Sequence, residues 1–176
     1  MGNDQFFDKA RSKHTARKYE EAIKLYQMVL MKNPKHLDAT YLLGTAYAEI
    51  GKLDAAKKYL LKAENLMPYS PYIKVNLGTI YKEQGEYETA FISFVDALEL
   101  QHDLPEARQN LVTVIEMMMD QKSEKAASRC LEYGLSCVRA ERKDEALAIL
   151  VVGNSLDPEN TRIRTQIDVL EGKLGS

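Results

Sequence analysis

The chain repeats itself every 34 residues. The motif LGTAY at residues 43–47 recurs as LGTIY at residues 77–81, and Gly51 recurs as Gly85. A fixed period of this length is typical of stacked helical or strand units, each too small to bury its own apolar face, so that neighbouring units supply the core. The repeat therefore favours a scaffold with an extended surface over a catalytic pocket.

Each repeating unit reads as two helices. In the unit at 37–70, apolar residues between Tyr41 and Ile50 fall at helical spacing, and Gly51 then ends the run. A second amphipathic run begins at Asp54 and stops before Pro68. Neither run alternates with the period of a strand, so the sequence predicts helical hairpins and an all-α fold.

The order of residue types in these units resembles the tetratricopeptide repeat. An apolar residue, Leu-Gly, Tyr and a turn glycine are followed by Ala, then Leu or an aromatic residue, Ala and Pro. Units 37–70 and 71–104 match this order almost completely, whereas 3–36 keeps only its second half. The polar first helix of 3–36 suits an end repeat, which has no neighbour on one side. The resemblance implies one domain over residues 1–176, a right-handed α-solenoid.

The register of the repeat slips between 105 and 126. Residues 105–119 repeat the first-helix pattern, but the best register afterwards is 127–160, which leaves 22 residues where 34 belong. A helix is then missing. In the other threading, which the short connection Asp120–Lys122 favours, 123–140 pairs with 105–119 and 144–156 pairs with 159–172. Both threadings predict about ten helices, a long helix around 123–140 and a C-terminal cap at 161–173.

Composition and cysteine spacing restrict the compartment of the protein and the classes of its partners. The formal net charge of −2 gives no reason to expect nucleic acid. No apolar run is long enough to cross a membrane or to act as a signal peptide. Cys130 and Cys137 would lie about 10 Å apart on one helix, too far for a disulfide. Free, buried thiols indicate a reducing compartment, and we expect a cytoplasmic protein.

Signals for catalysis, metals and cofactors are weak. His14, His36 and His102 are scattered, with no Cys or carboxylate at ligand spacing in a shared element. No glycine-rich phosphate loop follows a strand. We therefore expect no enzymatic activity, no metal site and no cofactor.

The resemblance implies a binding surface instead. In this family the first helices of successive repeats line a concave groove that commonly receives a peptide from a partner protein. The residues that project into this groove are Phe7, Arg11, Asp38, Tyr41, Leu42, Thr45, Tyr72, Asn76, Thr79 and Asn110. Tyrosine offers a large contact area and one hydroxyl, and asparagine can pair with an extended backbone. Tyr41 and Tyr72 can equally pack between adjacent repeats.

Two hypotheses for function follow. The favoured one is a protein–protein interaction scaffold or adaptor that holds a peptide segment of a partner. Some grooves of this family clamp the terminal carboxylate of chaperone tails, but only Asn76 matches that set of clamp residues, so we expect no such clamp. The alternative is a structural repeat segment of a larger protein or enzyme, which associates with a second copy of itself through an end repeat.

Overall fold

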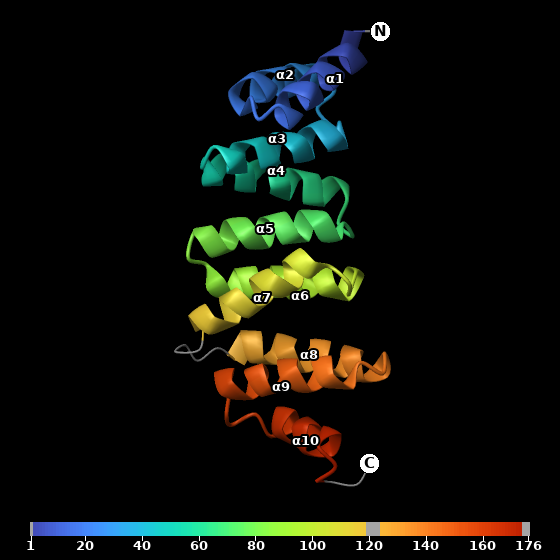
Figure 1. The fold of residues 1–176 in the computed structure, drawn as a ribbon, viewed down its shortest axis with the longest axis vertical. Coiled ribbons are helices and arrows are strands. Elements are labelled where there is room, and N and C mark those ends of the chain that lie inside the picture. Colours follow the sequence, from blue (N-terminus) through green and yellow to red (C-terminus); the bar gives the residue numbers. More distant parts are fainter. Residues whose placement is uncertain (1, 119–123, 174–176) are drawn as a thin grey trace. The chain divides into compact units, whose positions relative to one another are not determined.

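The computed structural model describes residues 2–118 and 124–173, and every regular element within them is an α-helix. These ranges contain ten helices, as the repeat pattern predicts (Figure 1). They are α1 (Gly2–Thr15), α2 (Tyr19–Lys32), α3 (Leu37–Glu49), α4 (Leu53–Leu66), α5 (Pro71–Glu83), α6 (Tyr87–Leu100), α7 (Pro105–Met118), α8 (Glu124–Arg139), α9 (Lys143–Leu156) and α10 (Thr161–Leu170). The 16-residue α8 is the longest of the ten, which confirms the prediction of a long helix around 123–140.

The chain divides into two compact units, Met1–Gly85 and Glu86–Ser176. The division falls in the turn of the predicted repeat 71–104, so that α5 belongs to the first unit and α6 to the second. In the first unit, α1 to α5 pack in chain order, each on the next. The single domain over 1–176 stays a prediction.

Side-chain caps mark the start of several first helices. His36 Nδ1 accepts a hydrogen bond from Ala39 N (3.3 Å) at the start of α3, and Ser70 Oγ does the same for α5. Asn160 Oδ1 caps α10 through the Ile163 N–H group (3.4 Å). These caps satisfy backbone donors that have no partner inside the helix. Asn160 holds the same place in the register 127–160 as His36 and Ser70 in theirs, so α10 begins like the first helix of a further repeat.

The turn inside each hairpin needs one residue in the left-handed conformation. Gly51 (φ 71°) takes this conformation between α3 and α4, where Gly51 N bonds to Ala48 O and Lys52 N bonds to Tyr47 O. This pair of hydrogen bonds is the Schellman motif, which ends a helix sharply. Arg17 (φ 56°) and Glu141 (φ 58°) occupy the equivalent position after α1 and α8. There the fold requires the same turn without a glycine.

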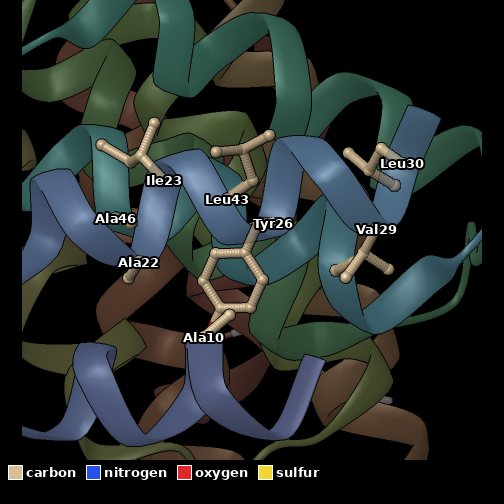
Figure 2. Close-up of a cluster of buried hydrophobic side chains, with 9 residues drawn as sticks. Ala10, Ala22, Ile23, Tyr26, Val29, Leu30, Leu43 and Ala46 are labelled. Atoms are coloured by element: carbon tan, nitrogen blue, oxygen red, sulfur yellow. The ribbon is translucent and has the colours of Figure 1, made fainter. Parts of the chain in front are cut away.

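A close contact between the first and second helix recurs through the hairpins. In the first repeat Tyr26 reaches from α2 toward Ala10 on α1 (Figure 2), and both residues are fully buried. The equivalent residues of the second repeat are Gly44 and Leu60, and a Cβ added to Gly44 would meet Leu60 Cγ at 2.9 Å. A small residue on one helix therefore makes room for a large one on the other. We call this contact the hairpin pair.

In the second unit the hairpin pair joins α8 to α9, which lie side by side (Figure 1). A Cβ on Gly134 would meet Leu150 Cγ at 2.7 Å, and one on Gly153 would meet Cys130 Cβ at the same distance. α7 packs on α6, and α6 also contacts α8, while α10 packs on α9.

This arrangement decides between the two threadings. The pairing of 123–140 with 105–119 is wrong, because α8 packs against α9, as the register 127–160 predicts. The small residues of α8 fit the side chains of α9 closely, and this fit outweighs the short distance along the chain between α7 and α8. Residues 144–156 and 159–172 pack together as the second threading proposed, since α10 lies on α9. The connection Asp120–Lys122 lies outside the described residues.

Glycine in place of Arg17 or Glu141 should stabilise the protein. A side chain in the left-handed conformation costs roughly 1–2 kcal/mol, and glycine loses about 0.5–1 kcal/mol more entropy on folding. We expect Glu141→Gly and Arg17→Gly each to raise the free energy of unfolding by up to about 1 kcal/mol in urea titrations. The reverse change at the same turn, Gly51→Ala, should lower it. Equal losses in all three variants would contradict this account of the turn.

The substitution Gly134→Ala should destabilise the protein, although alanine favours a helix over glycine by about 1 kcal/mol. The new methyl group would overlap Leu150, and such overpacking typically costs about 1–3 kcal/mol. Denaturant titrations of a double-mutant cycle can isolate the clash. In a Leu150→Ala background, where the space is empty, Gly134→Ala should be neutral or stabilising. A loss of the same size in both backgrounds would show that Leu150 is not the cause.

Candidate functional site

The structure places nine of the ten predicted groove residues in the first unit. Phe7 and Arg11 lie on α1, and Asp38, Tyr41, Leu42 and Thr45 lie on α3. Tyr72, Asn76 and Thr79 lie on α5, whereas Asn110 lies on α7 in the second unit.

Tyr41, Tyr72 and Asn76 come together at the centre of these residues. Asn76 Nδ2 donates hydrogen bonds to the hydroxyl of Tyr41 (2.8 Å) and to the backbone carbonyl of Tyr72 (2.9 Å). Both N–H groups of Asn76 are therefore engaged within the protein, so the amide can offer a ligand only its carbonyl oxygen. The ring of Tyr41 packs on the apolar core formed by α4 and α5, whereas the side chain of Tyr72 is 57% exposed. Of the two tyrosines, Tyr72 is the one available to a ligand.

A small pocket adjoins Tyr72. It has a volume of about 180 Å³ and is lined by Leu37, Asp38, Tyr41, Met67, Ser70, Tyr72 and Ile73. Pockets that hold a drug-sized molecule or a cofactor are usually about 300–1,000 Å³, so this one fits a single side chain. Most of its wall is apolar, and Asp38 supplies a carboxylate. The pocket can take an apolar side chain whose neighbouring groups donate hydrogen bonds. We call Asp38, Tyr72, Asn76 and this pocket the tyrosine surface.

The remaining predicted residues of the first unit also make contacts within the protein. Thr45 and Thr79 donate hydrogen bonds to carbonyls of their own helices, those of Leu42 and Val75. Leu42 is half-buried and packs on the core that includes α2. These three residues support α3 and α5 more than they offer free groups to a ligand.

Phe7 joins α1 to the next two helices. Its ring centroid lies 4.7 Å from that of His36 and 6.1 Å from that of Tyr26. The guanidinium of Arg11 lies 5.9 Å from the centre of the Phe7 ring, at the reach of a cation–π interaction. Phe7 is thus a packing residue, and Arg11 carries an exposed positive charge beside it.

Several groups that lie outside the tyrosine surface have a pKa that is shifted by burial. It raises the pKa of Tyr26 to about 12, and it raises the pKa of the Cys130 thiol to about 12. Burial also raises the pKa of Cys137. Both cysteines are free and buried, as the spacing predicts. A thiol that stays protonated at neutral pH is a poor nucleophile and a poor metal ligand, so these cysteines are packing residues.

Sequence reasoning missed a charge cluster around Arg129 on α8. Its guanidinium contacts Asp96 (2.6 Å) and Glu99 (3.0 Å) on α6, and also Glu132 on α8. Burial alone would lower the pKa of Arg129, but its hydrogen bonds to Glu132 and Glu99 raise that pKa above its usual value. The partners on α6 are 30 and 33 positions away in the chain, so no local pattern signals this cluster.

The described residues contain no group of three or more His, Cys, Asp or Glu side chains placed to hold a metal ion. Within the same residues, no helix combines the length and the apolar character that crossing a membrane requires.

The half-buried His14 should make stability depend on pH. It lies against Tyr19 and within 3.4 Å of the Tyr26 hydroxyl, and burial lowers its pKa below 6.5. Below pH 6.5 the unfolded chain therefore binds a proton that the folded chain resists, so the free energy of unfolding falls as pH drops.

We expect urea titrations at pH 7.5, 6.0 and 5.0 to show this fall, and His14→Gln to reduce it. The matched control is His102→Gln, because the side chain of His102 is exposed. A profile that His14→Gln does not alter would assign the pH dependence to other groups.

Comparisons with known proteins agree with this geometry. Residues 14–66 and 72–103 each match a sequence model described as tetratricopeptide repeat. The chain is 35% identical over 83 residues to Superkiller protein 3 of Schizosaccharomyces pombe, and this match covers 47% of this chain and 6% of that protein. It is 30% identical over 89 residues to human Tetratricopeptide repeat protein 6, covering 49% of this chain and 17% of that one. The chain thus spans only a small part of these relatives.

Solved structures show the same fold at low identity. The first TPR of Spaghetti (RPAP3) bound to the HSP90 peptide SRMEEVD has a TM-score of 0.64 at 20% identity, covering 66% of this chain and 92% of that one. The Yersinia enterocolitica type III secretion chaperone SycD, in complex with a peptide of the translocator YopD, has a TM-score of 0.56 at 21% identity (65% and 88%). MamA has a TM-score of 0.56 at 22% identity and covers 98% of this chain and 84% of that one. With its paired helices and recurring hairpin contacts, the chain carries helical repeats of the tetratricopeptide repeat family at residues 14–66 and 72–103.

Proposed function

We propose that the protein is a binding scaffold or adaptor, not an enzyme, and that its tyrosine surface holds an extended segment of a partner protein. The observation that carries this proposal is the exposed ring of Tyr72 beside a pocket the size of one side chain. Exposed tyrosines next to pockets are common anchors in interfaces, because they bury a large area at a low cost in entropy.

The polar groups of this surface define the ligand that suits it. Asp38 carries a negative charge, and Asn76 can offer only a hydrogen-bond acceptor. Both groups favour a ligand that donates hydrogen bonds, such as the backbone N–H groups of an extended segment or a basic side chain. An acidic tail such as SRMEEVD would meet repulsion at Asp38. Peptide complexes of similar fold, those of RPAP3 and SycD, support peptide binding in general but not the same ligand.

Selection of peptides from a random library displayed on phage, with the whole chain as bait, can test the proposal. We expect the affinity of a selected peptide to fall about tenfold or more in Tyr72→Ala and in Asn76→Ala, while both variants keep their thermal stability. Tyr69→Ala is the matched control, since the side chain of Tyr69 is 82% exposed and does not line the pocket. Selected peptides should be basic or neutral, and the peptide SRMEEVD should not compete with them.

If Tyr69→Ala weakens binding as much as Tyr72→Ala does, the tyrosine surface is not the binding site. A selection that yields mainly acidic peptides would likewise contradict the role given to Asp38.

The second candidate is a structural repeat segment of a larger protein. It is favoured by the small share of the curated relatives that the chain spans, 6% and 17% in the two cases above. In this case the repeats associate with further repeats or with a second copy. Sedimentation velocity over a wide concentration range tests the self-associating form, which predicts dimers that Tyr72→Ala leaves intact.

A further inference from the structure

Within the described residues, the first helix α7 of the second unit lacks the second-helix partner that α3 and α8 have. In the repeats at 37–70 and 127–160, Gly44 and Gly134 lie against Leu60 and Leu150 of the following helix. The residue at the same position of α7 is Val112. The next helix, α8, pairs with α9 instead, so no second helix among the described residues covers Val112, and its side chain is 51% exposed.

The uncovered face of α7 forms one wall of an apolar groove, and α9 forms the other. The groove has a volume of about 430 Å³. Its lining residues are Leu98 from α6, Arg108, Leu111, Val112, Ile115 and Glu116 from α7, Tyr133 from α8, and Glu145, Ala148, Ile149 and Val152 from α9. A smaller cavity of about 170 Å³ continues it, since both share Ile115 and Val152. We call this feature the α7–α9 groove.

Leu111, Val112 and Ile115 hold the positions that Leu43, Gly44 and Tyr47 hold in the repeat at 37–70. In that repeat the helix that follows, α4, packs over this part of α3. The α7–α9 groove therefore exposes the face of a first helix that a second helix normally covers. Its natural occupant has the shape of that absent helix, an apolar stripe along an α-helix.

The charges at the two ends of the groove suit a helix that runs antiparallel to α7, as second helices do. Glu116 lies toward the C-terminal end of α7, where the positive N-terminal end of such a helix would lie. Arg108 lies toward the other end, near the negative C-terminal end. Glu145 takes a hydrogen bond from Tyr133 (2.6 Å) and one from Arg142 (3.2 Å), while Arg108 is farther from it, at 3.6 Å. Arg108 can therefore turn to a guest at little cost.

We propose that the α7–α9 groove binds an amphipathic helix of a partner protein, antiparallel to α7, in the place of the second helix that the repeat at 105–126 lacks. The second helices α2, α4, α6 and α9 each contain 14 residues, which sets the expected length of the guest. Val112 restricts the residue type at one position of the guest helix. Because valine stands where the other repeats have glycine or alanine, the guest residue that faces it must be small, where α4 has Leu60 and α9 has Leu150.

Two helix-stabilised, fluorescently labelled peptides can test this proposal on the whole chain. One carries the sequence of α4, residues 53–66, and the other carries the same sequence with Leu60→Ala. We expect the Leu60→Ala peptide to bind the protein about tenfold more tightly by fluorescence anisotropy, because only the smaller residue fits against Val112. In a Val112→Gly variant this preference should reverse, since the groove would then resemble the surface of α3.

Two further variants locate the binding site. Val112→Asp places a charge in the groove, and Ala148→Trp fills the groove from an exposed position on α9, so at least one should keep its fold. Each should weaken binding of the Leu60→Ala peptide about tenfold or more. Leu100→Asp is the matched control, because Leu100 is 41% exposed on α6 and does not line the groove. Tyr72→Ala should also have no effect, which separates this site from the tyrosine surface.

Several results would overturn the proposal. The first is no binding of either peptide at millimolar concentration, and the second is binding that Val112→Asp and Ala148→Trp both leave intact. A dimer in sedimentation experiments that Val112→Asp abolishes would assign the groove to a second copy of the chain. Displacement of the peptide by micromolar lauric acid would assign it to an acyl chain.

Discussion

The contact on which the rest of this structure depends is the close approach of two helices at the hairpin pair. A small residue on the first helix, Ala10, Gly44 or Gly134, makes room for Tyr26, Leu60 or Leu150 on the second. Such close packing is sensitive to a single methyl group in either direction. The left-handed turns at Arg17, Gly51 and Glu141 bring the two helices into this contact, and the caps at His36, Ser70 and Asn160 start several of the first helices.

Where the hairpin pair is absent, the protein gains a surface. α7 carries Val112 where α3 and α8 carry glycine, and no second helix among the described residues covers it, so an apolar groove opens beside α9. The tyrosine surface has a different origin. It lies on α3 and α5, which are complete first helices, and it depends on one exposed ring held beside a small pocket. The two surfaces suit different guests, an extended segment with hydrogen-bond donors and an amphipathic helix.

Hydrogen bonds within the protein reduce the number of polar groups that these surfaces can offer to a ligand. Asn76, Thr45 and Thr79 are the kind of groups that bind a peptide backbone, yet each donates its hydrogen bonds within the protein. What remains is acceptor capacity, and this favours ligands that donate. The Arg129 cluster joins α8 to α6, but its members are partly exposed, so we expect it to contribute less to stability than the buried apolar contacts do.

The sequence alone was sufficient to predict the helices, the resemblance to the family and nine groove residues that lie on first helices of one unit. It was sufficient because the 34-residue period and the pattern of small and large residues are local signals. It also predicted free, buried cysteines from their spacing on one helix. The pairing of α8 with α9, the internal hydrogen bonds of Asn76, the partners of Arg129 and the α7–α9 groove were decided only by the tertiary structure. Each depends on residues far apart in the chain, and competition among helix faces for the best-fitting partner leaves no periodic trace in the sequence.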